Sequence, residues 1–179
     1  MPDHNLGADT VEAGDVIDLI IADHREMERL FAALRENEAD RAEGLRTLAD
    51  LLATHSLAEE SDVYPTFRHT EPEQAEEIDH GYEEHAEALQ ALAALQGIDD
   101  VDSQEWEDAL RELEEAVTHH AEDEESEVLE PAREKVPETT RFQLGKAFMR
   151  AREGWLQQRP GSPEKVKELL AEPGGSSPT

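Results

Sequence analysis

Two short segments of this chain place a histidine and a glutamate four residues apart, at His55 and Glu59 and again at His120 and Glu124. Residues four apart lie on the same face of an α-helix, so each segment presents an imidazole and a carboxylate together. One such pair is most often a surface pair. These two recur at matching places and continue seams of apolar residues spaced by three and four. We therefore interpret both pairs as facing a helical core.

The two pairs belong to an internal repeat. HREMERLFAAL, starting at His24, resembles HAEALQALAAL, starting at His85, and HSLAEESDVYP at His55 resembles HHAEDEESEVLEP around His120. In each half, a lone histidine on one helix is followed by His-x-x-x-Glu on the next. Two such helical hairpins facing each other across a pseudo-twofold axis would build a symmetric site from two equal contributions.

This pattern gathers four imidazoles and two carboxylates on inward-facing seams: His24, His55, Glu59, His85, His120 and Glu124. A buried carboxylate without a partner costs several kcal/mol or stays protonated, and these seams contain no Lys or Arg. Metal cations are the natural partners, and the mixture of imidazole and carboxylate suits iron, manganese or zinc. If Glu59 and Glu124 bridge, two ions can share them and keep coordination positions open for small ligands.

The other histidines lie off these seams. We expect His4, in the polar N-terminus, and His69, in a loop, to be exposed to solvent. His119 can pair with Asp123, but the apolar seam of its helix selects the neighbouring His120. His80 is offset from the inner seam of its helix and is a candidate additional ligand.

Four further side chains have two interpretations each. Tyr64 and Tyr82 either bring hydroxyls near the site or pack in the core. Met27 and Phe31 follow His24 by about one and two helical turns, so they either line a dry pocket or simply pack.

The apolar periodicity predicts the helices that must position these residues. A first helix begins after Asp15, a second covers about 41–64 until Pro65 stops or bends it, and a third covers about 72–96 until Gly97. A fourth begins at a cap formed by Asp102 and Ser103 and ends at Pro131. The predicted seams are Ile17, Ile20, His24, Met27, Phe31 and Leu34; Leu45, Leu48, Leu52, His55 and Glu59; Ile78, Tyr82, His85, Leu89 and Leu92; and Trp106, Leu110, Leu113, Val117, His120 and Glu124.

These elements predict an all-α fold, an antiparallel up-down-up-down four-helix bundle with a short fifth helix and a flexible C-terminal tail. The fifth helix is expected in TTRFQLGKAFMRAREGW, which is amphipathic. The expected organisation is a polar N-terminal segment over 1–14, one bundle domain over 15–155, and a tail over 156–179. The Pro, Gly and Ser content of residues 156–179 predicts a mobile tail with at most one or two helical turns.

Composition narrows the possible functions. A chain of 179 residues fits one domain, and 16 Lys and Arg against 45 Asp and Glu give a formal charge of −29. Nucleic acids and anionic membranes would be repelled, so we expect neither as a partner. The chain has no cysteine, which excludes disulfides, thiolate metal sites and iron–sulfur clusters. The longest apolar run, around Ile20, is too short to span a bilayer, and a cytoplasmic location is the default expectation.

The same segments resemble the hemerythrin-like, or HHE cation-binding, family from about Asp15 to Pro131. The resemblance rests on IADHREMERLF, ATHSLAEESDVYPTF, YEEHAEALQAL and VTHHAEDEESEVLEP, and LGKAFMRARE is similar to the helix that often trails this domain. It implies that the six seam residues bind two non-haem iron ions, with Glu59 and Glu124 bridging them. A diatomic molecule or peroxide is the implied small ligand.

One departure bears on function. Oxygen-carrying hemerythrins place two ligand histidines four apart on the third helix, whereas the positions four before and after His85 are Gly81 and Leu89. The missing fifth histidine, unless His80 replaces it, argues against simple oxygen carriage and favours binding of water, peroxide or nitric oxide and redox turnover. Ferritin-like proteins need two Glu-x-x-His motifs, of which only Glu77 to His80 is found, and the HExxH of zincin proteases is missing.

Four functions stay open at this point. The first is a di-iron protein that binds or reacts with dioxygen, hydrogen peroxide or nitric oxide. The second is a catalase-like enzyme that disproportionates peroxide, with Glu60, Glu125 or Tyr64 carrying protons. The third is iron sensing or storage, and the fourth is a metal-free helical interaction module. Whether the chain is an enzyme is therefore undecided, with a peroxide- or nitric-oxide-directed oxidoreductase as the enzymatic option.

Overall fold

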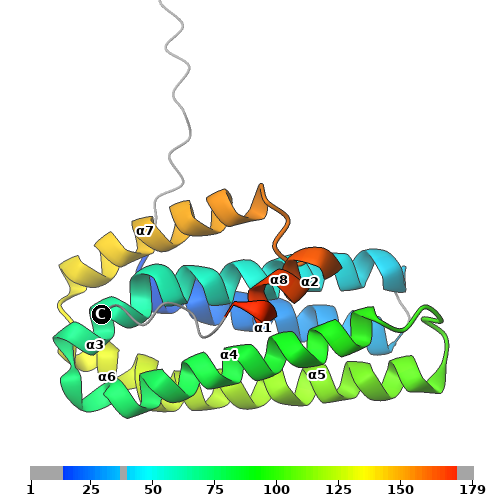
Figure 1. Cartoon of the computed structure of the whole chain (residues 1–179). Coiled ribbons are helices and arrows are strands. Elements are labelled where there is room, and N and C mark those ends of the chain that lie inside the picture. Colours follow the sequence, from blue (N-terminus) through cyan, green and yellow to red (C-terminus); the bar gives the residue numbers. More distant parts are fainter. Residues whose placement is uncertain (1–13, 37–39, 173–179) are drawn as a thin grey trace, which may run out of the picture.

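Four long helices lie side by side in the computed structural model, which describes residues 14–36 and 40–172 (Figure 1). They are α1 (Val16–Arg35), α2 (Arg41–Ala58), α4 (Ala75–Gln96) and α5 (Gln104–Asp123). The chain reverses between α1 and α2 and again between α4 and α5, so each pair is a hairpin. The described residues contain no strand, and the predicted all-α bundle is confirmed.

Side-chain caps fix where three of these helices begin. Asp15 accepts a hydrogen bond from the backbone N–H of Ile17 at 3.0 Å, and Asp40 accepts one from Glu43 at 2.9 Å. Ser103 accepts one from Trp106 at 3.1 Å, as the cap predicted there requires. Each cap satisfies a backbone donor that the first helical turn leaves unpaired.

The core consists of two apolar clusters with the polar site between them. One cluster lies toward the turns that join the helices of each hairpin, and it includes Met27, Phe31, Leu48, Leu92 and Trp106. The other includes Ile17, Ile20, Phe67, Ile78 and Phe148. Each large buried side chain contributes roughly 1.5–3 kcal/mol. Burial of these two clusters therefore supplies free energy that offsets the cost of burying the polar residues between them.

Two π-helical turns interrupt the helices directly at the predicted bridging glutamates. They are η1 (Glu59–Val63) after α2 and η3 (Glu124–Leu129) after α5. The N–H of Tyr64 donates to the carbonyl of Glu59 and that of Glu130 to the carbonyl of Glu125, both five residues back. The repeat in sequence is therefore also a repeat in backbone geometry, and such turns are frequent at functional sites.

Pro65, predicted to stop or bend its helix, and Pro131, predicted to end one, both lie in the first turn of a new helix. Pro65 is in α3 (Tyr64–Thr70) and Pro131 in α6 (Glu130–Lys135), with the short 3₁₀ turn η2 (Pro72–Gln74) leading into α4. A proline is tolerated at the start of a helix because its missing N–H has no intrahelical partner there. Each π turn therefore places the following proline at the start of a new helix while the chain continues in a helical conformation.

The buried face of α4 differs from the predicted seam. Gly81 and Ala88 are buried, whereas Tyr82 and Leu89 are only partly buried. The reason is packing. Small residues on α4 leave room for the neighbouring elements, and Tyr82 and Leu89 instead line a pocket of about 450 Å³ that α8 helps to enclose.

The predicted fifth helix is α7 (Glu138–Leu156), which packs along α1 and α2 (Figure 1). Its Gly145 allows close approach, because a Cβ there would lie 2.0 Å from the carbonyl oxygen of Gly14. Phe148 is fully buried, and Arg141 Nε donates to Asp15 Oδ2 at 2.7 Å. The helix therefore closes one side of the first hairpin.

The prediction of a flexible tail from 156 onward is wrong for residues 163–171, which form α8 (Pro163–Ala171). Val166 is fully buried in the first apolar cluster. The preceding turn is anchored by Gly161, whose N–H donates to Asp50 Oδ1 at 3.1 Å and whose carbonyl accepts from Gln96 Nε2 at 2.8 Å. A Cβ on Gly161 would lie 2.2 Å from the carbonyl carbon of Ala49, so only glycine permits this contact.

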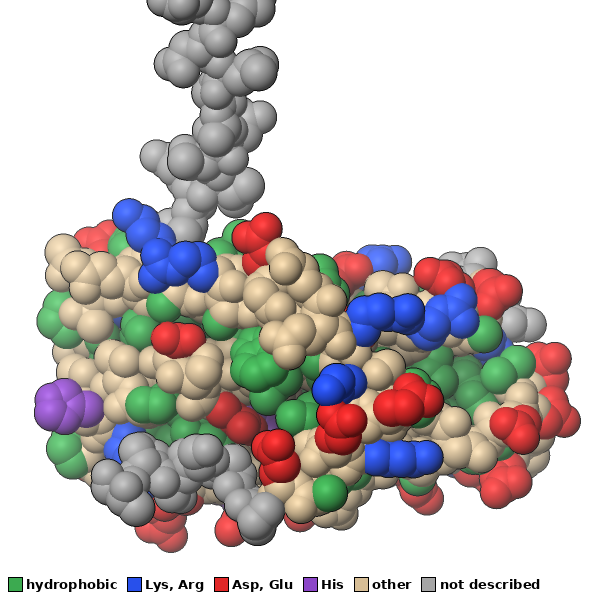
Figure 2. Space-filling model, turned by 45° about the horizontal axis from the view of Figure 1, so that its top comes forward, with side chains coloured by type: hydrophobic (Ala, Val, Ile, Leu, Met, Phe, Trp, Pro, Cys, Tyr) green, Lys and Arg blue, Asp and Glu red, His purple; other side chains and the backbone are tan. Residues whose placement is uncertain are grey.

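The molecular surface mixes charges of both signs on the face that carries α7 and α8 (Figure 2). Among the helices of the described residues, none combines the length and the apolar character that crossing a membrane requires. Residues 1–13, with His4, and the end of the tail, 173–179, lie outside the described residues.

Candidate metal centre

All six residues predicted to bind metal converge between the two apolar clusters, with exposures from 0% to 5%. The first hairpin and its π turn contribute His24, His55 and Glu59, and the second contributes His85, His120 and Glu124. Metal-ligating atoms of His24, His55, His120 and Glu124 lie within 4.8 Å of one another, as do those of Glu59, His85 and His120. The structure thus brings together every member of the predicted set.

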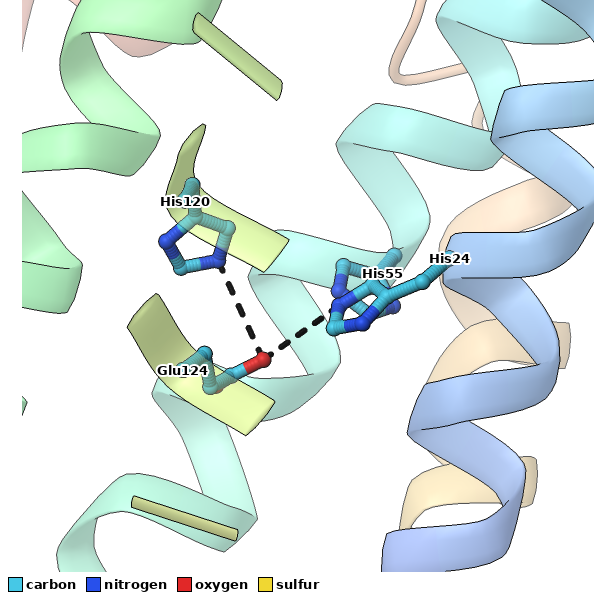
Figure 3. Close-up of side chains that lie close together, drawn as sticks. All are labelled: His24, His55, His120 and Glu124. Atoms are coloured by element: carbon cyan, nitrogen blue, oxygen red, sulfur yellow. Dashed lines mark ion pairs between the residues drawn. The ribbon is translucent and has the colours of Figure 1, made fainter. Parts of the chain in front are cut away.

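Each central glutamate faces one imidazole from each hairpin. Glu59 Oε1 lies 3.3 Å from His55 Nε2, and Glu59 Oε2 lies 3.1 Å from His85 Nε2. Glu124 Oε2 lies 3.3 Å from His24 Nε2 and 3.9 Å from His120 Nε2 (Figure 3). Each of the two carboxylates therefore contacts imidazoles from both hairpins.

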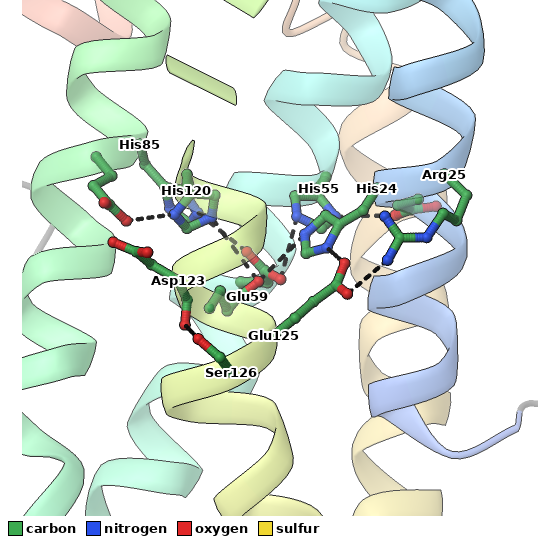
Figure 4. Close-up of polar contacts among 12 residues, drawn as sticks. His24, Arg25, His55, Glu59, His85, His120, Asp123, Glu125 and Ser126 are labelled. Atoms are coloured by element: carbon green, nitrogen blue, oxygen red, sulfur yellow. Dashed lines mark hydrogen bonds and ion pairs between the residues drawn. The ribbon is translucent and has the colours of Figure 1, made fainter. Parts of the chain in front are cut away.

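A second ring of carboxylates holds the outer nitrogen of every central histidine (Figure 4). A carboxylate accepts the hydrogen bond, so each Nδ1 carries a proton and each Nε2 is directed at the centre, where its lone pair can bind a metal once any second proton has left. The four pairs are His24 with Glu125 at 2.9 Å, His85 with Glu60 at 2.8 Å, His55 with Asp23 at 3.2 Å and His120 with Glu84 at 2.8 Å.

This outer ring obeys the same pseudo-twofold relation as the ligands. Asp23 and Glu84 immediately precede the lone histidine of their hairpin, and Glu60 and Glu125 immediately follow the central glutamates. Sequence reasoning proposed Glu60 and Glu125 only as proton carriers and missed Asp23 and Glu84. The signal was available, since an acidic residue occupies matching positions in both halves of the repeat.

Five buried polar atoms at the centre have no hydrogen-bond partner among residues 14–36 and 40–172. They are His24 Nε2, His55 Nε2, both carboxylate oxygens of Glu59, and Glu124 Oε2. Buried polar atoms are nearly always paired, and leaving one unpaired costs about 1–3 kcal/mol. Because all five point at one another across the centre, they fit metal ions held by nitrogen and oxygen ligands.

Tyr64 fills the space beside Gly81, one of the two positions four residues from His85 that lack a histidine. Its hydroxyl donates to Glu124 Oε1 at 2.7 Å and lies 3.4 Å from His85 Nε2. A Cβ added to Gly81 would lie 2.8 Å from this hydroxyl. Tyr64 therefore belongs to the centre, which decides between its two interpretations, and a side chain at position 81 cannot coexist with it unchanged.

Burial and the central carboxylates shift the pKa values of these groups in opposite directions. Burial lowers the pKa of His24 and His85, but Glu124 and Glu125 outweigh it for His24, raising its pKa to about 9, and Glu59 and Glu60 raise that of His85 to about 10. Burial lowers the pKa of His55 to about 4. Without metal, two imidazoles of the centre therefore hold protons at neutral pH.

The two glutamates also differ. Burial and the nearby charge of Glu124 raise the pKa of Glu59 to about 8. Burial acts in the same direction on Glu124, but the close approach of His24 and the charge of His120 outweigh it and hold its pKa well below the usual range. A metal ion bound by His24, His85 and Glu59 would have to displace protons from all three.

The remaining candidates lie outside the centre. His80 does not replace the missing histidine, because its side chain is 51% exposed and its Nε2 faces Glu84 Oε1 at 3.2 Å. His119 pairs with Asp123 as predicted, at 3.6 Å, and His69 is exposed as predicted but lies in α3 rather than in a loop. Met27 and Phe31 pack in the first apolar cluster.

Tyr82 also stays outside the centre and reaches only the outer ring. It is partly buried, and its hydroxyl donates to the backbone carbonyl of Glu60 at 3.4 Å. Its ring lies across that of Tyr64, with centroids 5.1 Å apart. Tyr82 therefore packs against the tyrosine of the centre.

The fold and this cluster together define a helical-bundle protein with a buried cation site made of histidine and glutamate. The family model of the hemerythrin HHE cation binding domain matches residues 15–132. The match spans more than half of the chain, which therefore belongs to the hemerythrin HHE cation-binding family. Comparisons with curated proteins and with solved structures find no match.

Proposed function

We propose that the centre holds two iron ions bridged by Glu59 and Glu124, and that it binds or reacts with dioxygen, hydrogen peroxide or nitric oxide. The observation that carries the proposal is the set of five buried polar atoms without hydrogen-bond partners among the described residues. Both glutamates face imidazoles from each hairpin, an arrangement suited to two shared ions. When bound, iron supplies a redox couple and open coordination positions for small ligands.

The protein supplies orientation, proton storage and selection by size. The outer carboxylates fix each imidazole with Nε2 directed inward. Tyr64 holds a proton 2.7 Å from Glu124, and this phenol is fully buried. The helices that position the ligands also enclose the centre. Only small molecules can therefore reach it unless the bundle rearranges.

The test is anaerobic loading with ferrous ion, removal of loosely held metal by desalting with a weak chelator, and measurement of iron and the absorption spectrum. We expect two retained irons per chain and spectral changes on adding dioxygen, peroxide or nitric oxide. Glu59→Ala and Glu124→Ala should each lose retained iron, whereas His69→Ala, an exposed control, should not. Equal retention by all three variants would refute the ligand assignment.

A catalase-like activity is the second candidate, because groups that can carry protons connect the centre to solvent. Glu60 and Glu125 contact His85 and His24 on one side, and their side chains are 23% and 25% exposed. Such groups would move protons during disproportionation of two peroxide molecules to dioxygen and water. Oxygen evolution from hydrogen peroxide by the iron-loaded protein would support this activity, and its absence would favour binding or sensing.

A further inference from the structure

A second cluster of metal-ligating side chains lies outside the centre, between α4 and α5. His80 and Glu84 come from α4, and His119 and Asp123 come from α5. Glu84 Oε1 lies 3.2 Å from His80 Nε2 and 3.8 Å from His119 Nε2, which is itself 3.6 Å from Asp123 Oδ2. Ligand atoms of His80, Glu84 and Asp123 all lie within 4.8 Å of one another. Figure 4 shows Asp123 directed away from the central Glu59.

The pseudo-twofold relation shows what this cluster lacks. Asp23 and Glu84 are equivalent, since each binds the Nδ1 of a central histidine with one oxygen. The second oxygen of Asp23 is neutralised by Arg152 of α7, whose Nη2 lies 3.1 Å from Asp23 Oδ1. The second oxygen of Glu84, Oε1, belongs to a residue that is only 7% exposed, and it makes no hydrogen bond of good geometry in the described part of the chain. Only the imidazoles of His80 and His119 face it, and no Lys or Arg of the described residues pairs with it as Arg152 pairs with Asp23. A cation held by these imidazoles would complete the equivalence.

The surroundings favour a metal ion over an organic cation. The side chains of His80 and His119 are 51% and 66% exposed, so both imidazoles can turn toward Glu84 Oε1 at little cost. A cavity of about 10 Å³ beside the cluster is too small for a guanidinium or ammonium group on a carbon chain. Two imidazole nitrogens and two carboxylates are ligands that divalent iron, zinc and cobalt accept readily.

We propose that His80, Glu84, His119 and Asp123 form a separate, solvent-facing site for a divalent first-row transition metal. The ion takes the role that Arg152 has in the other half of the repeat. It also lies next to the centre without belonging to it, because Glu84 binds the ion through Oε1 and His120 through Oε2. The cavity continues from this cluster to Tyr64 and Glu124, so the site sits at the solvent side of the buried centre.

The experiment is equilibrium dialysis of the full chain, stripped of metal, against Zn²⁺ without chelator. The variants are the double substitution His80→Ala with His119→Ala, the conservative Asp123→Asn, and the control His69→Ala. Circular dichroism and thermal melting confirm folding, which we expect to be retained because both substituted histidines are exposed. The wild type and the control should bind one more Zn²⁺ per chain than the double variant, and Asp123→Asn should weaken binding of that same ion.

The outcomes separate this site from the proposed centre. Three ions in the wild type and two in the double variant support both sites. One ion in the wild type and none in the double variant support the outer site while the centre fails. The same number of ions in the wild type and the double variant, whatever that number is, overturns the outer site.

Discussion

The contact between Tyr64 and Gly81 gives a quantitative test of how the centre is built. Alanine is favoured over glycine inside a helix by about 1 kcal/mol, so Gly81→Ala would normally stabilise α4. Here the new Cβ meets the Tyr64 hydroxyl at 2.8 Å and the ring carbon Cζ at 3.1 Å. Overpacking of this kind costs about 1–3 kcal/mol. We therefore expect Gly81→Ala to lower the free energy of unfolding by between zero and about 2 kcal/mol relative to the wild type.

Removing the Tyr64 hydroxyl should reduce the overpacking cost of Gly81→Ala. Tyr64→Phe alone should cost about 1.5–3 kcal/mol, because it takes the donor from a buried, charged Glu124 at 2.7 Å. In the Tyr64→Phe background, Gly81→Ala should then be more favourable by at least about 1 kcal/mol than in the wild type, since the closest atom is gone.

Urea unfolding of the metal-free protein measures all four members of this cycle, with the slope of the transition checked for constancy. Gly44→Ala, which meets the flexible end of Leu34 far from the centre, is the control and should show no dependence on Tyr64. If Gly81→Ala changes the free energy of unfolding equally in both backgrounds, Tyr64 does not occupy the space above Gly81.

Three further predictions follow from the centre and from α8. Glu60→Gln should lower iron affinity about 10- to 100-fold in a competition assay with a chelator, because it weakens the hold on His85 Nδ1; an affinity equal to that of His69→Ala would contradict this role. The metal-free protein should melt at lower temperature as pH rises from 6.5 toward 9, because His24 and His85, with pKa values raised to about 9 and 10, keep in the folded state protons that the unfolded chain releases near pH 6.5. The iron-loaded protein, whose imidazoles are already deprotonated, should lack this fall; parallel curves for the two forms would count against the ligand set. Val166→Ala should cost about 1–3 kcal/mol in thermal or urea unfolding, since Val166 is fully buried, whereas a truly mobile tail would show no change.

Helical periodicity and the repeat were sufficient to predict the bundle and to bring together the six central residues. The reason is that His24, His55, His85 and His120 continue apolar seams, and a seam fixes which face of a helix is buried. The same logic failed for α4, where Gly81 and Ala88 face inward and Tyr82 does not. Hydrophobicity identifies large residues, whereas close helix packing selects small ones.

Other features depend on contacts that no local pattern encodes. The π turns begin at Glu59 and Glu124, but the prolines six and seven residues later read as helix ends when only α-helical spacing is considered. The docking of α8 depends on the approach of Gly161 to the backbone of α2, a contact between residues far apart in sequence. The outer carboxylates, in contrast, have a signal in the sequence. The repeat places an acidic residue next to each lone histidine and next to each central glutamate.

The two π turns determine how the domain would respond to a change in chain length. Each is a one-residue excess absorbed inside a continuous helix, so deleting a single residue such as Ser61 would leave an ordinary α-helix rather than a broken loop. Glu59 would keep its orientation, and the N–H of Tyr64, which now donates to the carbonyl of Glu59 five residues back, would make the same bond as an ordinary one four residues back. The extra residue of η1 is therefore accommodated locally, and the placement of Tyr64 relative to Glu59 does not depend on it.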